Sequence, residues 1–206
     1  MSDIATLVTV GVAFWVVAAT PGPATISNAA IAMRHGRRVS IVYGLGLSVG
    51  LVFWGLLAAT GMGAVLQASA TVLSVLKVLG GLYLLWLAWG SARSAMRRNE
   101  AESATVAGGR WFRRGLVLNL SNPKAVLAWM AALSMGLDAN DDVGAVAATT
   151  LVCIAVAFFN NWSYSVVFSL GGMMAVYRRF RRWVEGVTAA LFAVGGVALI
   201  RSAFSR

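Results

Sequence analysis

Long apolar stretches alternate with short polar or glycine-rich pieces along the whole chain. An apolar run of about 20 residues is what a helix needs to cross the hydrocarbon core of a bilayer. The pattern therefore predicts six transmembrane helices joined by short loops. Their approximate limits are Ile4–Met33, Ile41–Gly61, Val72–Ala92, Leu116–Met135, Val143–Leu170 and Val184–Ile200.

Basic residues are concentrated in every second loop. Arginines follow the first, third and fifth apolar segments, whereas the loops after the second and fourth segments contain neither Lys nor Arg. Short loops rich in Lys and Arg stay on the cytoplasmic side of a membrane. We therefore expect a multi-pass protein of the cytoplasmic (inner) membrane with both termini outside the cytoplasm. The basic loop residues are Arg34, Arg37, Arg38, Arg93, Arg97, Arg98, Arg110, Arg113, Arg114, Arg178, Arg179, Arg181 and Arg182.

The composition fits a membrane protein and disfavours other classes. Of the 206 residues, 59% are hydrophobic and only 12% are charged, against roughly 25% charged in a soluble domain. Six spans would use nearly all of the chain, so we expect one transmembrane domain, residues 1–206. The net charge of +10 comes mainly from the loop clusters, so no nucleic-acid partner is expected. Because the start Met1-Ser2-Asp3 is not basic, we expect a retained first helix and not a signal peptide.

The two halves of the chain, about 1–95 and 110–206, are weakly similar. All three prolines lie in two breaks, Thr20-Pro21-Gly22-Pro23 in the first helix and Asn122-Pro123 in the fourth. Each half holds three helices, an odd number, so the halves would insert in opposite directions, as in many secondary transporters. The expected fold class is an all-α integral membrane protein whose six transmembrane helices form two inverted three-helix repeats with Pro-broken first and fourth helices.

The two proline breaks indicate where a polar site would lie. A proline removes one backbone donor and clashes with the preceding turn. In hydrocarbon the freed backbone groups are tolerated only where protein or a water-filled cavity meets them. The half-helices beginning near Ala24 and Lys124 would each direct free amides and a positive dipole end at an anionic group. For either break alone, a kink needed only for packing is the alternative.

Lys124 is the most informative single residue. A charge this deep in a span costs at least ~2.5 kcal/mol unless it faces a cavity or a partner. The alternative is a lysine that snorkels to the cytoplasmic interface. A polar cluster around Asn160 and Asn161 should also point into the bundle, either to bind substrate or to bond other helices. The candidate binding and translocation residues are Pro21, Gly22, Pro23, Thr25, Ser27, Asn28, Asn119, Asn122, Pro123, Lys124, Asn160 and Asn161.

Nothing in the sequence suggests catalysis or a bound cofactor. There is no phosphate loop and no nucleophile paired with a base. Cys153 is the only cysteine, which rules out a paired-cysteine metal site. No acidic residue is expected deep in a span, because Glu185 stands at the cytoplasmic start of the last one. We therefore expect neither an enzyme nor a metal or cofactor site.

Short motifs recur in a fixed order over nearly the whole chain. They are Pro21-Gly22-Pro23, Gly36-Arg37-Arg38, Leu76-Lys77 with Gly80-Gly81, and Asn119-Leu120 leading to Asn122-Pro123-Lys124-Ala125. In this combination the chain resembles the lysine exporter superfamily, specifically its homoserine/threonine efflux branch. The resemblance implies six helices, efflux of amino acids or related small metabolites, and use of the proton motive force. Many members share an acidic residue in the fifth helix, where this chain has Asn160 or Asn161, and an amide cannot titrate.

Two functions are to be distinguished. The first is a secondary exporter that binds an amino acid or derivative between the halves, with its carboxylate near Thr25, Ser27 and Lys124 and its ammonium near Asn160 and Asn161. The second is a non-transporting membrane scaffold or assembly factor on the same fold, with a filled centre and Lys124 at the interface. The lipid bilayer is the environment in both cases. Substrate identity, direction of transport and a homo-oligomeric state stay open.

Overall fold

The computed structural model is helical throughout its main elements, and it describes residues 4–68, 70–96, 109–136 and 143–204. This confirms the all-α class for the described part of the chain. The loop after the fourth apolar segment, which has neither Lys nor Arg and carries Asp138, Asp141 and Asp142, is expected outside the cytoplasm. These three residues lie outside the description. The helices in chain order are α1 (Ile4–Ala19), α2 (Pro23–Ala68), α3 (Ala70–Met96), α4 (Trp111–Leu120), α5 (Pro123–Gly136), α6 (Val143–Val167) and α7 (Met173–Phe204).

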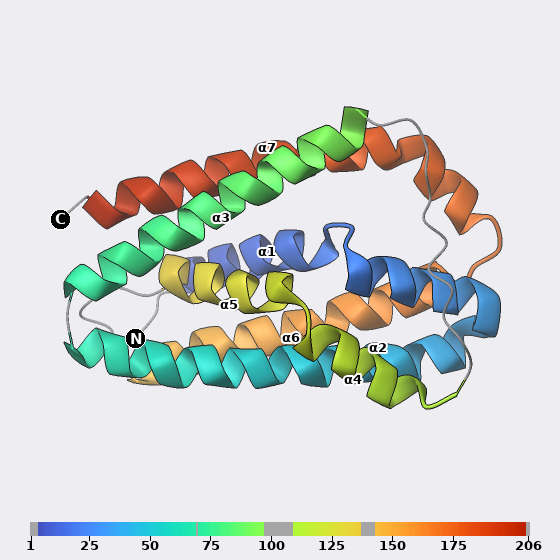
Figure 1. Cartoon of the computed structure of the whole chain (residues 1–206), viewed down its shortest axis with the longest axis horizontal. Helices are drawn as coiled ribbons and strands as arrows, with labels where there is room; N and C mark the ends of the chain where they lie inside the picture. The colour runs from blue at the N-terminus through green and yellow to red at the C-terminus, as the bar shows by residue number, and fades with distance from the viewer. Residues whose placement is uncertain (1–3, 69, 97–108, 137–142, 205–206) are drawn as a thin grey trace.

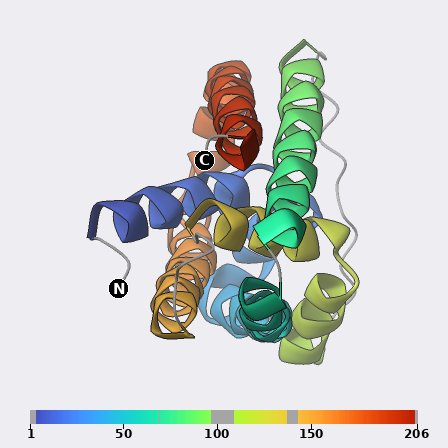
Figure 2. The ribbon, with the colours of Figure 1, turned by 90° about the vertical axis from the view of Figure 1, so that its left-hand side faces the viewer.

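The helices pack in layers along one long axis. Figure 1 shows α3 and α7 side by side at one edge, and α2, α4 and α6 at the opposite edge. The short helices α1 and α5 lie between these two groups, as the view turned by 90° in Figure 2 also shows. Both α1 and α5 are halves of broken helices, so the breaks lie in the middle of the molecule.

Both predicted helix breaks are present. Residues 20–22 are not helical, and α2 begins at Pro23 directly after them. In the second break α4 ends at Leu120 and α5 begins at Pro123, with a bend of 62° between the two axes. Pro23 and Pro123 each take the first position of a helix, where a missing amide costs no intrahelical bond. The prolines therefore end one half-helix and start the next.

Two expected boundaries are wrong. The loop expected around Arg34 to Arg38 is a kink at Gly36 within α2, where φ of 80° and ψ of 172° turn the chain in a single residue. Positive φ is open to glycine because it has no Cβ. The loop expected at residues 178–182 is helical, because α7 begins at Met173. Hydropathy marks where an apolar stretch ends, whereas these helices continue into polar sequence.

Glycines bring backbones of different helices close together. A Cβ on Gly81 of α3 would lie 2.7 Å from the carbonyl oxygen of Gly196 in α7, and a Cβ on Gly196 would lie 2.8 Å from that of Gly81. Between α2 and α4, a Cβ on Gly46 would collide with Phe112, and one on Gly115 with Tyr43. Small residues at helix contacts are typical of membrane bundles, where close van der Waals packing holds helices together.

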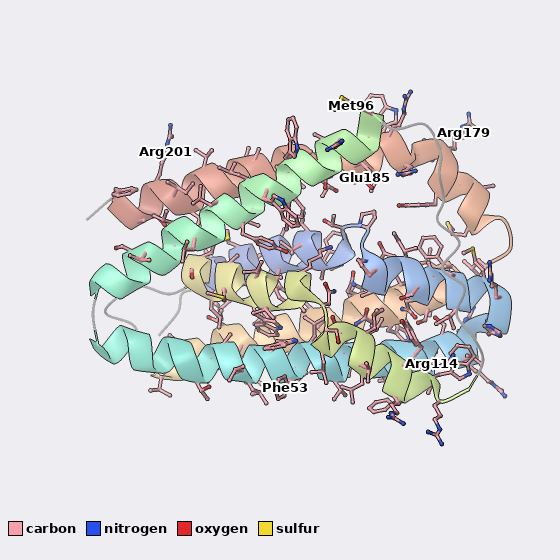
Figure 3. All side chains as sticks on the ribbon, in the orientation of Figure 1. Phe53, Met96, Arg114, Arg179, Glu185 and Arg201 are labelled. Atoms are coloured by element: carbon pink, nitrogen blue, oxygen red, sulfur yellow. The ribbon has the colours of Figure 1, made fainter. Side chains whose placement is uncertain are left out.

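The surface and the helix lengths fit a bilayer. Within the described residues, Pro23–Gly61, Val143–Val167 and Arg179–Phe204 are long and apolar enough to cross a membrane, and the bent pair α4–α5 makes a fourth candidate. Large apolar side chains such as Phe53, which is 53% exposed, point away from the bundle (Figure 3). Arg114 and Arg179 lie toward one end of the long axis and Arg201 toward the other (Figure 3).

Candidate functional site

Three side chains from other helices bind the backbone carbonyls at the end of α1. The ammonium of Lys124 donates to the carbonyl of Thr20 at 2.8 Å, and the hydroxyl of Tyr164 donates to that of Ala19 at 2.6 Å. The amide of Asn160 donates to Ala18 more weakly, at 3.5 Å. The last carbonyls of a helix have no intrahelical partner. Because α1 ends inside the molecule, α5 and α6 supply the missing donors.

The break between α4 and α5 is held mainly by asparagines. The Oδ1 of Asn122 accepts from the backbone N–H of Lys124 at 3.1 Å, which caps the start of α5. The amide of Asn122 lies 3.5 Å from the Oδ1 of Asn119, and Asn119 donates in turn to the carbonyl of Leu47 in α2. The first half of the chain therefore contacts the second break directly. The backbone N–H of Lys124, which was expected to face an anion, already donates to Asn122.

Thr25 has a comparable role at the start of α2. Its Oγ1 accepts from the backbone N–H of Gly22 at 2.9 Å, and it lies 3.3 Å from the carbonyl of Thr20 and 3.2 Å from that of Gly22. One hydroxyl thus ties the non-helical residues to the first turn of α2. Thr25 is buried, and its hydroxyl serves the break itself.

A cavity of about 40 Å³ lies where the two breaks meet. Such a volume holds only a few water molecules. Phe14, Val17 and Leu51 supply part of the apolar wall. The predicted site residues that the structure brings together on its lining are Gly22, Thr25, Asn119, Asn122, Lys124, Asn160 and Asn161.

Two polar groups at this cavity have unused bonding capacity. The Oδ1 of Asn160 has no hydrogen-bond partner among the described residues, and the residue is buried, with only 3% of its surface exposed. An ammonium carries three donors, and Lys124 uses one of them on Thr20. An acceptor without a partner on one side and a cation on the other suit a ligand with a cationic and an anionic end.

Ser27 and Asn28 are not among the residues that line this cavity. Ser27 bonds the hydroxyl of Tyr43 at 2.8 Å and the carbonyl of Pro23 at 2.6 Å. Asn28 is fully buried, donates to the carbonyl of Asn161 at 3.0 Å and accepts from Ser40 at 2.8 Å. These bonds join α2 to itself and to α6, which is the helix-to-helix alternative for Asn28.

The other predicted residues divide between the break and the cavity. Asn161 lines the cavity, and its amide donates to Ser48 of α2 at 2.9 Å. Pro21 lies in the non-helical stretch and Pro23 begins α2 with an exposed side chain. Pro123 begins α5, and its side chain lies outside the description. The prolines therefore shape the site, while the asparagines and Lys124 present polar atoms.

Lys124 is placed inside the molecule. A Cβ on Gly22 would lie 3.5 Å from the Nζ of Lys124, and Lys124 shares the cavity lining with Asn160. The side chain is partly buried. This placement disagrees with a lysine that reaches for the lipid headgroups.

Sequence reasoning left two residues out of the site. Tyr164 belongs to the polar cluster around Asn160 that was expected to point into the bundle, but it was not among the site candidates. It stands four positions after Asn160, one helical turn away on the same face of α6, and this spacing could have identified it. Glu185, the second of these residues, is only 3% exposed. Its position near the start of an apolar stretch gave no sign of this burial, because the side of α7 that faces the bundle is set by packing against α3.

Comparison with known proteins identifies the family. The family model described as LysE type translocator matches residues 15–203. The chain belongs to the LysE-type translocator family. It is 31% identical to a threonine efflux protein of Salmonella typhi over 191 residues, 89% of this chain and 91% of the relative. Identity to the threonine efflux protein of Escherichia coli strain K12 is also 31%, over 192 residues with the same coverage.

A leucine efflux protein of Enterobacter sp. strain 638 is 30% identical over 201 residues, 92% of each chain. No solved structure matches the chain significantly. Membership of this family, together with the apolar helices, makes the chain a multi-pass protein of the inner membrane and a translocator, not an enzyme. Nearly the whole chain is matched, including both helix breaks.

Proposed function

We propose that this LysE-type translocator exports amino acids or closely related small metabolites across the cytoplasmic membrane. The observation that carries the proposal is the cavity between the two breaks, with the Lys124 ammonium and the unpartnered Asn160 Oδ1 on its lining. An amino acid has a carboxylate and an ammonium close together, which matches this pair of groups. The relatives named threonine and leucine efflux proteins support the same substrate class.

In the proposed binding mode the substrate carboxylate lies near Lys124 and its ammonium near Asn160. The carboxylate takes one of the two Lys124 donors not used on Thr20. The ammonium donates to the Oδ1 of Asn160, which relieves a buried acceptor of the cost of being unpaired. Ser27 has no part in this mode because Tyr43 and the Pro23 carbonyl occupy its hydroxyl.

The proposed topology has six spans and two inverted repeats. The first span is α1 with the part of α2 before Gly36, and the fourth is α4 with α5. The rest of α2, α3, α6 and α7 supply the other spans. The reciprocal contact of Gly81 and Gly196, in the third helix of each half, supports this plan. Rocking of one half against the other would open the cavity alternately to each side.

The scaffold alternative is less well supported. It calls for a filled centre and Lys124 at the interface, whereas a cavity lies at the breaks and Lys124 lines it.

We propose further that efflux uses the proton motive force, because the resemblance to the lysine exporter superfamily implies this energy source. Efflux from cells, or uptake into inverted vesicles, should then stop when ionophores collapse both the pH gradient and the membrane potential. Efflux that survives this collapse contradicts the proposed energy source.

Counterflow tests the function itself. The purified chain is reconstituted into vesicles loaded with one unlabelled amino acid at high concentration, and uptake of the labelled compound is followed from a dilute outer solution. Threonine and leucine are tested first, then the other common amino acids. Transient accumulation that empty vesicles lack is the expected result. Absence of counterflow for every amino acid, with correctly inserted protein, would overturn the proposal.

A further inference from the structure

Two fully buried residues outside the cavity lining hold a polar atom with no hydrogen-bond partner among the described residues. They are Trp129 in α5, with its indole Nε1, and Thr149 in α6, with its hydroxyl oxygen, and both residues are 0% exposed. Trp54 and Tyr83 also hold such an atom, but these two residues are less deeply buried. A buried donor without a partner destabilises a fold, so each such group in a native structure needs an explanation.

Thr149 stands on the face of α6 that reaches the cavity. Ala157 lines the cavity, and Cys153 and Thr149 precede it at intervals of four residues, which places all three on one face of the helix. Cys153 and Thr149 are both fully buried. Because an α-helix rises 1.5 Å per residue, this face leads from the cavity to Thr149 over about 12 Å.

Trp129 stands next to the cavity, between α1 and α2. Its ring centroid is 4.8 Å from that of Phe14, which belongs to the cavity wall. The indole also meets α2, where a Cβ on Gly55 would lie 2.5 Å from the Cζ2 of Trp129. Only a residue without a side chain leaves room for the indole at this position. Phe14 and Trp129 therefore fill the space between α1, α2 and α5 directly beside the cavity.

Thr149 lies farther from the breaks, in the same direction. A Cβ on Gly136, the last residue of α5, would lie 3.2 Å from the Cγ2 of Thr149 and 2.7 Å from the Cγ2 of Val10 in α1. Helices α1, α5 and α6 therefore meet around Thr149. Figure 1 shows α1 and α5 side by side, both extending from the breaks toward the end of the molecule where α1 begins. With both termini outside the cytoplasm, as the charge pattern predicts, this end is the outer one.

We propose that an exported amino acid leaves the cavity along this line between α1, α5 and α6, and that Trp129 and Thr149 donate in turn to its carboxylate. During passage the indole N–H and the hydroxyl find the acceptor that they lack among the described residues. The rings of Phe14 and Trp129 must separate before the substrate passes. This inference rests on the proposed function and adds to it the exit route and two residues that guide the substrate along it.

A donor used during passage and a purely structural hydroxyl differ in their effects on stability and rate. A hydroxyl without a partner adds nothing to the folded state, and valine has the shape of threonine without this group. Thr149→Val should therefore leave the unfolding temperature unchanged or raise it. Loss of an interaction that is made only during passage lowers the maximal rate of exchange, while KM stays the same. The variant should be as stable as wild type and slower.

Threonine counterflow in vesicles and thermal unfolding in detergent measure these two effects. Thr149→Val should lower the maximal exchange rate roughly threefold to tenfold without a change in KM. Thr149→Ser keeps the hydroxyl and should exchange close to the wild-type rate. The matched control is Thr150→Val at the next position, because the hydroxyl of Thr150 already donates to the carbonyl of Val146 at 2.7 Å. This control should keep the wild-type exchange rate.

Trp129→Phe tests the donor nearer the cavity. The smaller ring keeps an aromatic side chain beside Phe14 but removes the N–H, so the maximal exchange rate should again fall roughly threefold to tenfold. Because the smaller ring leaves a void, some loss of stability is expected as well. The Thr149 variants decide the matter if Trp129→Phe fails to insert.

Three outcomes would overturn the inference. The first is a wild-type exchange rate in a folded Thr149→Val or Trp129→Phe variant, and the second is a Thr149→Val variant that changes only KM. The third is a Thr149→Val variant that unfolds at a clearly lower temperature, which would show that the hydroxyl has a partner within the fold. A wild type that exchanges no amino acid overturns the proposed function itself, whereas an active wild type with an unaffected Thr149→Val variant overturns only the exit route.

Discussion

The ammonium of Lys124 donates to the carbonyl oxygen of Thr20 across 2.8 Å, although the two residues stand 104 positions apart. Lys124 belongs to the first turn of α5 and Thr20 follows the end of α1, so this one bond joins the two helix breaks. A substrate carboxylate that binds Lys124 must therefore share the ammonium with the break. Binding and the geometry of the broken helix are linked at this atom.

Tyr164→Phe isolates the bond between α6 and the end of α1. The change removes only the hydroxyl that donates to Ala19 at 2.6 Å, so the ring contacts stay. We expect a loss of about 1 kcal/mol in the free energy of unfolding and a moderate fall in the exchange rate. Thermal unfolding in detergent and counterflow measure the two effects. Unchanged stability would show that water replaces the hydroxyl without cost.

Asn160→Ala tests the unpartnered acceptor of the cavity. Because the change removes the Oδ1 that is proposed to bind the substrate ammonium, KM for exchange should rise about 5-fold to 30-fold, which corresponds to about 1 to 2 kcal/mol of binding energy. Asn160→Asp supplies an oxygen at the same place, so it should bind substrate at least as well, and its exchange should gain a new dependence on pH. An unchanged KM in Asn160→Ala would place the ammonium elsewhere.

The breaks and the inward Lys124 could be predicted from the sequence because their physical rules are strict. A proline removes a backbone donor wherever it stands, and a lysine deep in a span needs a cavity or a partner. Asn119, Asn122 and Asn160 were selected because they stand near these features or in a polar cluster within a span. In the structure all three line one cavity.

Other features depend on packing and could not be predicted. Asn28 was expected to be a site candidate or a helix-to-helix bond, and its partners Ser40 and Asn161 are visible only once α2 and α6 are placed together. A kink at Gly36 stands where a loop was expected. It could not be predicted because charge and hydropathy do not distinguish a kink from a loop. Glu185 was assigned to a helix start, but burial depends on which face of α7 meets the bundle.

Gly81→Ala tests the contact between the third helix of each half. The new methyl group would lie 2.7 Å from the Gly196 carbonyl oxygen, so α3 and α7 must separate, at a cost of about 1 to 3 kcal/mol. Gly90→Ala is the matched control in the same helix, because a Cβ there meets no atom within 4 Å. It should be neutral or slightly stabilising. Equal unfolding temperatures for the two variants would contradict the close approach.

Cysteine labelling tests the proposed topology. Cys153 is buried, and Cys153→Ala gives a background without thiols. In that background an impermeant maleimide should label Ser2→Cys and Ser205→Cys in intact cells. It should label Arg38→Cys only after the inner membrane is permeabilised, because short arginine-rich segments stay in the cytoplasm. Labelling of Ser205→Cys only after permeabilisation would exclude an even number of spans with both termini outside.

The central claim is that an amino acid crosses the membrane through the cavity where Lys124 meets the broken helix. The most direct test is threonine counterflow by wild type, Lys124→Ala and Lys124→Arg in vesicles with equal amounts of inserted protein. Because Lys124 is bonded to Thr20, Lys124→Ala should also lose about 1 to 3 kcal/mol of stability, so insertion is checked by thermal unfolding. We predict that Lys124→Ala lowers exchange roughly tenfold to a hundredfold and that Lys124→Arg keeps part of it, since a planar fork replaces a compact ammonium poorly. Exchange at the wild-type rate by a folded Lys124→Ala variant would contradict the account.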